Sequence, residues 1–202
     1  MDYWYSGNLN ETVNRREKEG IIYYIRGMRE VQGHRMERYG IQTHFIEEGE
    51  SYVDLVKQYV LPIYKEGDYL SISEKVIAMC QDNTVYMEDV KVGLFAKVLS
   101  KFGKKTKSGI GITEVHKLQL MIDMKGHICV LFAAVLGGLG KLIGKRGIYY
   151  RIVGAEAAGI DGFYKESAFK AYHRMATLTP KHPDQVCQRI EEKTGIPVIS
   201  DT

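Results

Sequence analysis

The chain has 202 residues, of which 45% are hydrophobic and 26% charged, and its formal net charge is +3. This length suits one domain of ordinary size with a substantial core, or two small ones. So small a net charge does not indicate a nucleic-acid-binding protein. The three cysteines, Cys80, Cys129 and Cys187, are far apart and form no C-x-x-C pair. They argue against a disulfide framework and a zinc knuckle, and they predict a reducing, cytoplasmic location.

The first half of the chain alternates strand and helix patterns. In order, the pattern predicts a polar extension that is partly helical (1–20), two strands (21–26, 34–46), a helix (47–68), a strand that runs into a loop or helix start (68–80) and a helix (89–102). The helix at 47–68 is the clearest of these. Ser51 can cap it, and its valines at 53, 56 and 60 share one face with Ile63.

The second half begins with a loop-rich basic segment. In order, the pattern then predicts a strand or short helix (117–124), a buried apolar segment (128–144), a strand entering a loop (147–161), a helix (182–195) and a final strand that starts at Pro197. The apolar segment holds four glycines and a lysine, which favours a buried segment over a transmembrane helix. We therefore expect neither a membrane nor a nucleic acid as partner. Strands and helices alternate, so the predicted fold class is α/β or α+β.

Two aspartates are the strongest candidates for chemistry. Asp161 ends the motif AGID, where small residues allow a tight turn, and Asp201 follows the final strand. Two carboxylates at strand tips can converge at one edge of a sheet and hold Mg²⁺ or Mn²⁺ against phosphate. The alternative is that Asp161 caps a helix or completes a turn.

Other motifs give weaker predictions. Ser73, Glu74 and Lys75 lie at a predicted strand end, where backbone amides and the lysine could hold phosphate. The alternative there is an exposed charged turn. The glycine cluster at 137–147 is not a phosphate loop, because no Gly lies five positions before either Gly-Lys pair and neither lysine precedes Ser or Thr.

Several motifs, taken in order, resemble the coenzyme F-420-0:gamma-glutamyl ligase family, GTP-dependent enzymes that add γ-linked glutamate to a deazaflavin coenzyme. These are HFIEEGES (44–51), EGDYLSISEKVIA (66–78), AGID (158–161) and LTPKHPDQVCQRIEEKTGIPVISDT (178–202). The resemblance covers roughly residues 40–202 and is weakest over 103–146. We accordingly divide the chain into an N-terminal extension, 1–36, and a ligase-like domain, 37–202, that ends before the family's C-terminal part.

The resemblance implies a set of site residues. Asp161, Asp201 and Thr202 are implied to bind Mg²⁺ or Mn²⁺. The implied nucleotide-binding residues are Thr43, His44, Phe45, Ile46, Glu74 and Lys75. The implied reaction phosphorylates a substrate carboxylate with GTP, and the amine of L-glutamate then attacks the acyl phosphate. The implied fold is an unusual α/β arrangement that pairs into an intertwined homodimer.

The sequence departs from the family pattern at several positions. Met79 stands where a phosphate-binding lysine is expected, and Phe163 and Tyr164 replace a Ser-Asn pair. His44 replaces a proline of the first loop. These departures leave two alternatives open beside the enzyme: a divergent homologue without catalysis that acts as a binding or assembly protein, and an α/β domain that shares only the fold.

Overall fold

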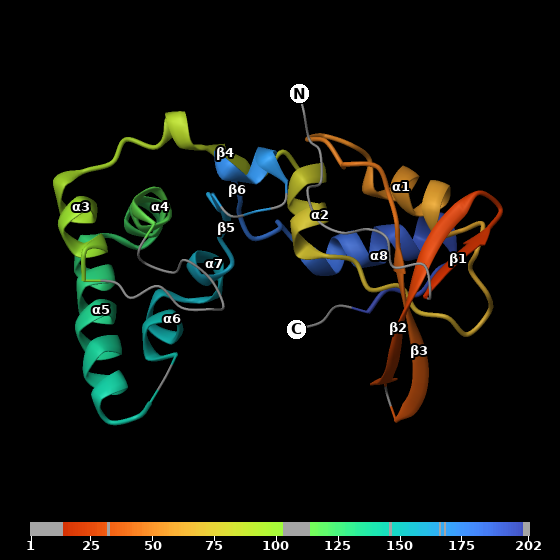
Figure 1. Ribbon diagram of the computed structural model, residues 1–202, viewed down its shortest axis with the longest axis horizontal. Helices are drawn as coiled ribbons and strands as arrows, with labels where there is room; N and C mark the ends of the chain where they lie inside the picture. The colour runs from red at the N-terminus through yellow and green to blue at the C-terminus, as the bar shows by residue number, and fades with distance from the viewer. Residues whose placement is uncertain are drawn as a thin grey trace. The chain divides into compact units, whose positions relative to one another are not determined.

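The computed structural model describes residues 14–31, 33–102, 114–145, 147–165, 167 and 169–199 (Figure 1). These residues belong to two compact units. Unit 1 is the described part of Asn83–Pro180, and unit 2 combines 14–82 with 181–199. Both units contain helices and strands, so the predicted mixed α/β class is confirmed.

Unit 2 consists of an antiparallel sheet and three helices. Its strands, in the order β1-β2-β3, are β1 (Arg15–Lys18), β2 (Ile21–Val31) and β3 (His34–Ile41). Its helices are α1 (Tyr52–Tyr59), α2 (Glu74–Cys80) and α8 (Pro183–Thr194). The expectation of helix in the extension is wrong for residues 15–18, which pair with β2. The segment 68–80 is mostly helix, because α2 begins directly after Ser73.

Two helices of unit 2 have the end signals that their sequences predict, although α1 ends at Tyr59 and is shorter than the predicted helix at 47–68. The Ser51 hydroxyl accepts a hydrogen bond from the Asp54 amide at 3.2 Å and caps α1. Pro183 lies at the start of α8, and Gly195 ends it with φ 74°. The predicted final strand forms a parallel bridge between Val198 and Leu70.

The core of unit 2 lies where α1, α2 and α8 meet. Its buried members are Val56, Ile77, Val186, Ile190 and Ile196. Side chains three and four positions apart fall on the same face of a helix, so each helix contributes one apolar stripe to this core.

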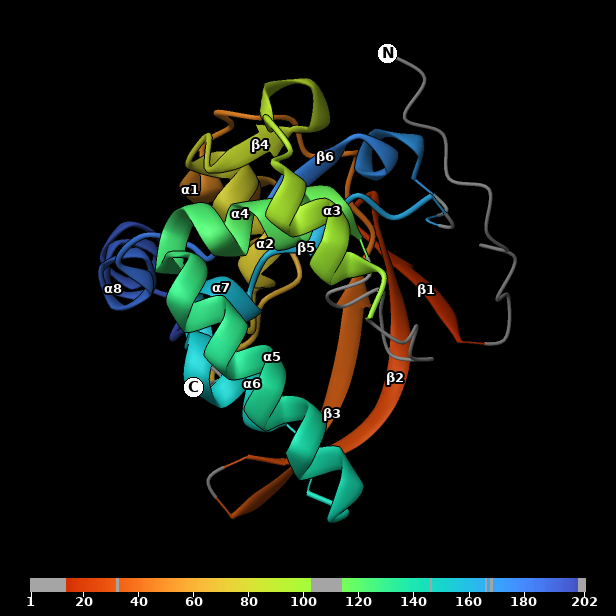
Figure 2. The same cartoon turned by 90° about the vertical axis from the view of Figure 1, so that its left-hand side faces the viewer.

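Unit 1 consists of helices and a small antiparallel sheet (Figure 2). Its helical elements are η1 (Met87–Asp89), α3 (Leu94–Ser100), α4 (Val115–Lys125), α5 (His127–Leu142), α6 (Ile148–Val153), α7 (Ala155–Ala158) and η3 (Lys170–His173). Its strands, in the order β4-β6-β5, are β4 (Thr84–Tyr86), β6 (Met175–Thr177) and β5 (Asp161–Gly162).

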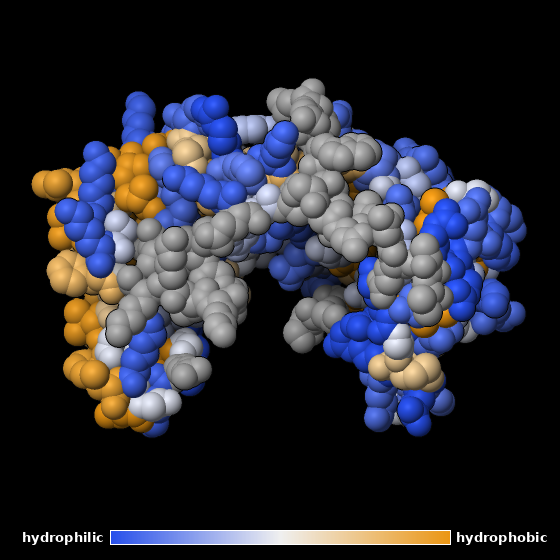
Figure 3. Space-filling model, in the orientation of Figure 1, coloured by the Kyte–Doolittle hydropathy of each residue, from blue (hydrophilic) through white to orange (hydrophobic). Residues whose placement is uncertain are grey.

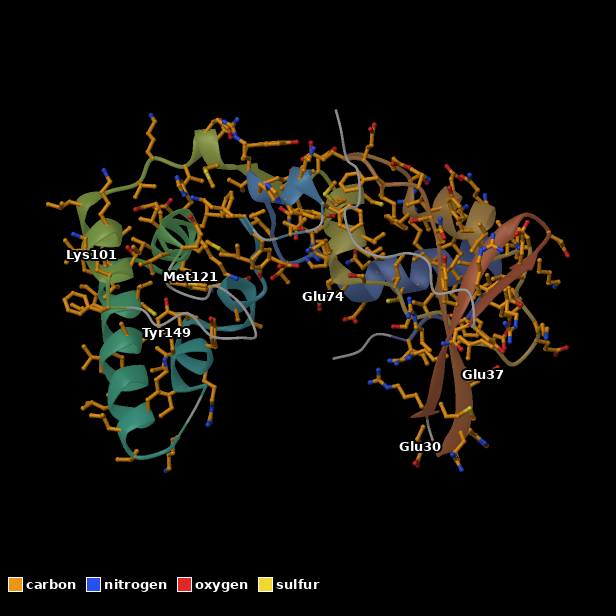
Figure 4. All side chains as sticks on the ribbon, viewed as in Figure 1. Glu30, Glu37, Glu74, Lys101, Met121 and Tyr149 are labelled. Atoms are coloured by element: carbon orange, nitrogen blue, oxygen red, sulfur yellow. The ribbon has the colours of Figure 1, made fainter. Side chains whose placement is uncertain are left out.

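Two sequence predictions in unit 1 need correction. The segment 147–161 is not a strand: it forms α6 and α7, separated at Gly154. Its β-branched and aromatic residues favour a strand locally, but Tyr149 and Val153 lie four positions apart and are both buried on one helix face. Figure 4 shows Tyr149 and Met121, whose hydroxyl and sulfur atoms are 3.3 Å apart in this core.

The second correction concerns the apolar segment 128–144, which was expected to be buried. It forms most of α5, and only one of its faces is buried. Within the described residues, no single helix is long and apolar enough to cross a membrane, and only α4 and α5 taken together, with a bend of 119° between them, meet that test of length and composition. The ambiguous segment 117–124 is resolved as helix α4.

Gly162 is where the sheet of unit 1 has no room for a side chain. A Cβ atom at this position would overlap backbone atoms of Met175 and Ala176 on β6. The pairing of Asp161 with Thr177 and of Gly162 with Ala176 therefore requires glycine at 162.

We expect Gly162→Ala to lower the free energy of unfolding by about 2–4 kcal/mol, because β5 and β6 must move apart. Urea unfolding followed by circular dichroism measures this loss. Gly138→Ala is the matched control. Position 138 lies in α5 with no atom within 4 Å of an added Cβ, so the control should gain up to about 1 kcal/mol from helix propensity. Equal stabilities of the two variants would contradict the proposed close approach.

Candidate functional site

Asp161 occupies the edge of the small sheet in unit 1. It begins β5, and its backbone pairs with Thr177 of the central strand β6. The Thr177 hydroxyl also donates to the Asp161 carbonyl at 3.2 Å. Ile160 and Phe163 on either side are almost fully buried, whereas Asp161 itself remains partly exposed. The sheet therefore fixes the backbone of Asp161, and the residue as a whole stays partly exposed.

The loop before Asp161 is tightly packed. Gly159 lies against Thr179, and an added Cβ at position 159 would overlap the Thr179 hydroxyl oxygen. That hydroxyl donates to the carbonyl of Glu156 on α7 at 3.1 Å. The small residues of AGID thus serve the close approach between this loop and the chain after β6.

Tyrosine hydroxyls lie beside the Asp161 carboxylate. The Tyr164 hydroxyl is hydrogen-bonded to Asp161. Burial chiefly, followed by this hydrogen bond and the nearby negative charge, raises the pKa of Tyr164. Burial and the charge of Asp161 also raise the pKa of Tyr172. Both phenols therefore stay protonated at neutral pH, and the Tyr164 hydroxyl can donate to the carboxylate.

The second half of the aspartate pair cannot be compared with Asp161. Asp201 and Thr202 both lie outside the described residues. Within the described ranges, no three His, Cys, Asp or Glu side chains come close enough together to hold a metal ion. Their joint metal site remains a prediction.

The first loop of unit 2 is organised by His44. Its Nδ1 lies 2.7 Å from the Tyr59 hydroxyl of α1, and its Nε2 lies 2.8 Å from a Glu50 carboxylate oxygen. The other Glu50 oxygen accepts from the backbone amide of Glu47. Because Tyr59 and Glu50 hold the two ring nitrogens, His44 joins the loop to the helix that follows it.

The other first-loop residues are placed less specifically. The Thr43 hydroxyl donates to the His44 carbonyl at 2.8 Å and is exposed. Phe45 and Ile46 are half-buried. These positions allow contact with a ligand, but nothing among the described residues tests their predicted nucleotide-binding role.

Glu74 and Lys75 form the first turn of α2 and do not lie at a strand end. Ser73 is the N-cap residue, Glu74 is exposed and Lys75 is half-buried (Glu74 is labelled in Figure 4). An acidic residue in a first helical turn is favourable on its own, because it faces the positive end of the helix dipole. The location of Glu74 thus has a sufficient structural explanation.

Sequence comparison identifies the family to which this chain belongs. A sequence model of the F420-0:Gamma-glutamyl ligase family matches residues 40–196. The chain belongs to this family. The match supports a ligase role, and it includes Asp161, the first loop and the start of α2. Among curated proteins, none matches this chain.

Two positions at which this chain departs from the family pattern carry buried apolar side chains. Met79, where a lysine was expected, is buried and only 3% exposed. Phe163, where a serine was expected, is 1% exposed and adopts a positive φ of 55°. A positive φ at a bulky residue is uncommon and marks a local constraint. Both side chains belong to the protein interior.

Sequence reasoning missed three contributors to these sites. Glu50 and Tyr59 hold His44, and Tyr164 binds Asp161. Glu50 and Tyr59 are six and fifteen residues from His44, and neither spacing is a recognised motif. The sequence indicates Tyr164 only as a residue that differs from the family pattern. Its position three residues after Asp161 was the available signal, because residues flanking a tight turn commonly contact each other.

Cys80 at the end of α2 provides a test of this geometry. Burial chiefly, with a further contribution from the negative charge of Glu50, raises the pKa of Cys80 to about 11. A thiol with this pKa is only about 0.1% thiolate at about pH 8, and the thiolate is the reactive form.

We therefore expect Cys80 to react slowly with iodoacetamide, at a rate that still rises about tenfold per pH unit between about pH 8 and 10. Peptide mass spectrometry measures the rate at this cysteine alone. The same protein in denaturant is the control, in which the rate should level off near the ordinary thiol pKa of about 8.5. A plateau near that pH in the folded protein would contradict the proposed environment.

Proposed function

We propose that this chain is a GTP- and divalent-metal-dependent ligase that joins L-glutamate to a carboxylate acceptor, in keeping with its family. The acceptor implied by the resemblance is the coenzyme F-420 precursor. The observation that carries the proposal is the arrangement at Asp161, where an aspartate at the sheet edge, at the end of the AGID motif, has a fixed backbone and is partly exposed.

The residues present are compatible with a divalent cation. Mg²⁺ usually binds through one or two carboxylates plus substrate phosphates and keeps several waters, so it does not require a cage of protein ligands. Asp161 would hold such an ion, with Asp201 and Thr202 as the further ligands that the resemblance implies. The ion would supply neutralisation of the charge on a transferring phosphoryl group.

The proposed reaction has two steps. The substrate carboxylate attacks the γ-phosphorus of GTP, which forms an acyl phosphate and releases GDP. The glutamate amine then attacks the acyl carbon, loses a proton and displaces phosphate, which forms the amide bond. The chain's own residues position the reactants: the first loop around His44 and the α2 start at Glu74 and Lys75 are the proposed nucleotide contacts.

Tyr164 has a defined part in this proposal. Its hydroxyl is within hydrogen-bonding reach of the Asp161 carboxylate, and donation from a phenol would help to hold that side chain in place. Tyr164 is thus a positioning residue, and it replaces the polar side chain that the family usually carries there.

The alternative is a homologue that binds a ligand or partner without catalysis. Two observations favour it. Met79 is buried where a phosphate-binding lysine was expected. The Asp161 carboxylate already has a hydrogen-bond donor in Tyr164, and this donor must be retained or displaced when a metal ion binds.

Isothermal titration of GTP into the protein, with and without Mn²⁺, tests the proposal. We expect binding that requires Mn²⁺ and that weakens at least about tenfold in Asp161→Asn and in Asp201→Asn, because each loses a charged ligand. Asp89→Asn, an exposed aspartate of unit 1 outside these motifs, is the matched control and should bind as the unaltered protein does.

The outcomes separate the alternatives. Metal-dependent binding should be followed by release of GDP and phosphate when glutamate and the acceptor are added. No GTP binding in a sample with intact circular dichroism would overturn the ligase proposal and favour the non-catalytic homologue. An equal loss in Asp161→Asn and Asp89→Asn would show that the effect is not specific to the AGID loop.

A further inference from the structure

Helix α5 carries its large apolar residues on the outside. Its exposed large side chains are Ile128, Leu131, Phe132, Val135, Leu139 and Leu142. Their spacing of three, four and seven places them along one helix face. Its buried residues are Val130, Ala133, Gly137 and Gly140. In a typical surface helix of a globular protein the large apolar residues face the core, whereas in α5 they face outward and the small residues face inward.

The small residues on the inner face have a packing role. An added Cβ at Gly137 would lie 3.0 Å from Cβ of Tyr149, and one at Gly140 would overlap Ile148. Glycine at these positions lets α5 lie close against α6. The inner face of α5 therefore supplies the contacts that the core of unit 1 needs from this helix. The apolar residues on the outer face of α5 are not explained by packing in that core.

Helix α3 extends the apolar surface. Leu94, Val98 and Phe102 are exposed at intervals of four residues. Phe95 contacts His127 at a centroid distance of 5.2 Å, which joins α3 to the beginning of α5. Figure 3 shows hydrophobic residues gathered over α3 and α5. We call this surface, made by the exposed apolar residues of α3 and α5 with Phe102 and Ile143, the α3–α5 face.

The α3–α5 face is too large to be incidental. Next to its end, between α5 and α6, lies an open apolar pocket of about 340 Å³, lined by Leu136, Leu139, Gly140, Leu142, Ile143 and Ile148. With roughly 100 Å² of exposed area for each large side chain, the face reaches on the order of 1,000 Å², whereas the largest apolar patch on a typical monomer is about 300–600 Å². Patches above that range mark binding surfaces.

The described segments that carry the face are basic. Residues 90–102, 124–145 and 147–155 contain seven Lys and Arg and no Asp or Glu. The acidic residues nearest to them in the chain are Asp89, Glu114, Asp123 and Glu156, and Glu156 pairs with Lys125. Among the described residues, Lys97, Lys101, Lys141 and Lys145 are exposed beside the apolar positions (Lys101 is labelled in Figure 4). An apolar surface with a cationic border fits a surface that is both apolar and anionic.

We propose that the α3–α5 face docks on an anionic lipid bilayer, with α5 lying in the plane of the interface. Helices with Leu and Phe on one side and lysines at the border bind membranes in this way, through apolar burial and attraction to acidic headgroups. This proposal does not depend on the ligase function, and it departs from the sequence-based expectation of no membrane partner.

Two other occupants fit less well. A second copy would bring two like-charged borders together, which opposes self-association. A membrane-spanning arrangement fits the length and packing of α5 less well: its 16 residues reach only about 24 Å, less than the roughly 30 Å hydrocarbon core. The bend of 119° and the burial of Leu118, Met121 and Ile122 keep α4 within unit 1.

Co-sedimentation with lipid vesicles tests the proposal. We expect the full chain to bind vesicles of phosphatidylcholine mixed with phosphatidylglycerol, and to bind pure phosphatidylcholine much less. Phe132→Glu should weaken binding at least roughly tenfold, because one buried aromatic side chain is lost and a negative charge is added. Met28→Glu in β2 is the matched control, since Met28 is 55% exposed and Phe132 57%. It should bind as the unaltered protein does.

The cationic border is tested separately. Lys141→Gln and Lys145→Gln should each weaken binding roughly fivefold and reduce its salt dependence. Lys57→Gln, an exposed lysine of α1, is the control and should have no effect. Circular dichroism and thermal unfolding verify that every variant is folded.

Three results would overturn the proposal. The first is the absence of binding to anionic vesicles by the folded protein. The second is equal binding by Phe132→Glu and Met28→Glu. The third is a dimer in light scattering that Phe132→Glu converts to a monomer while neither form binds vesicles, which would assign the face to a second copy.

Discussion

The pairing of β5 with β6 is the constraint on which the candidate site depends. It forms only because residue 162 has no side chain, so that the backbone of β5 can approach Ala176 closely. This pairing fixes Asp161 at the sheet edge and directs Phe163 into the core. The turn that follows brings the Tyr164 hydroxyl back to the Asp161 carboxylate. One short strand thus couples the packing of unit 1 to the group most suited to metal chemistry.

Unit 2 holds its candidate residues by a different means. The bond from His44 to Tyr59 connects the first loop to α1, and α1 is anchored by Val56 in the core that it shares with α2 and α8. The start of α2 depends on the same core through Ile77. Buried apolar neighbours therefore fix the positions of exposed polar residues in this unit. A substitution in the core would shift the first loop even though the substituted residue does not contact that loop.

Helix α5 shows that an apolar sequence is not the same as a buried one. The segment 128–144 contains enough Leu, Ile, Val and Phe to suggest a core element, but the space available beside α6 admits only its small residues. The larger residues are left outward, next to lysines whose segment contains no acid. Exposing so many large apolar side chains to water costs free energy. Binding to a surface that is both apolar and anionic would offset that cost.

The sequence by itself determined the mixed α/β class, the capped helices α1 and α8, and the family, because caps, apolar periodicity and motif order are all local or linear signals. It did not determine that 147–161 is helical, because the β-branched and aromatic residues of this segment locally favour a strand. The helix is favoured only because it buries Tyr149 and Val153 together in the core of unit 1. Nor did it reveal the contacts from His44 to Glu50 and Tyr59, or from Tyr164 to Asp161. Only the tertiary structure decides which face of a helix is buried and which polar side chains meet. These depend on the shape of the neighbouring element, and no local pattern encodes that shape.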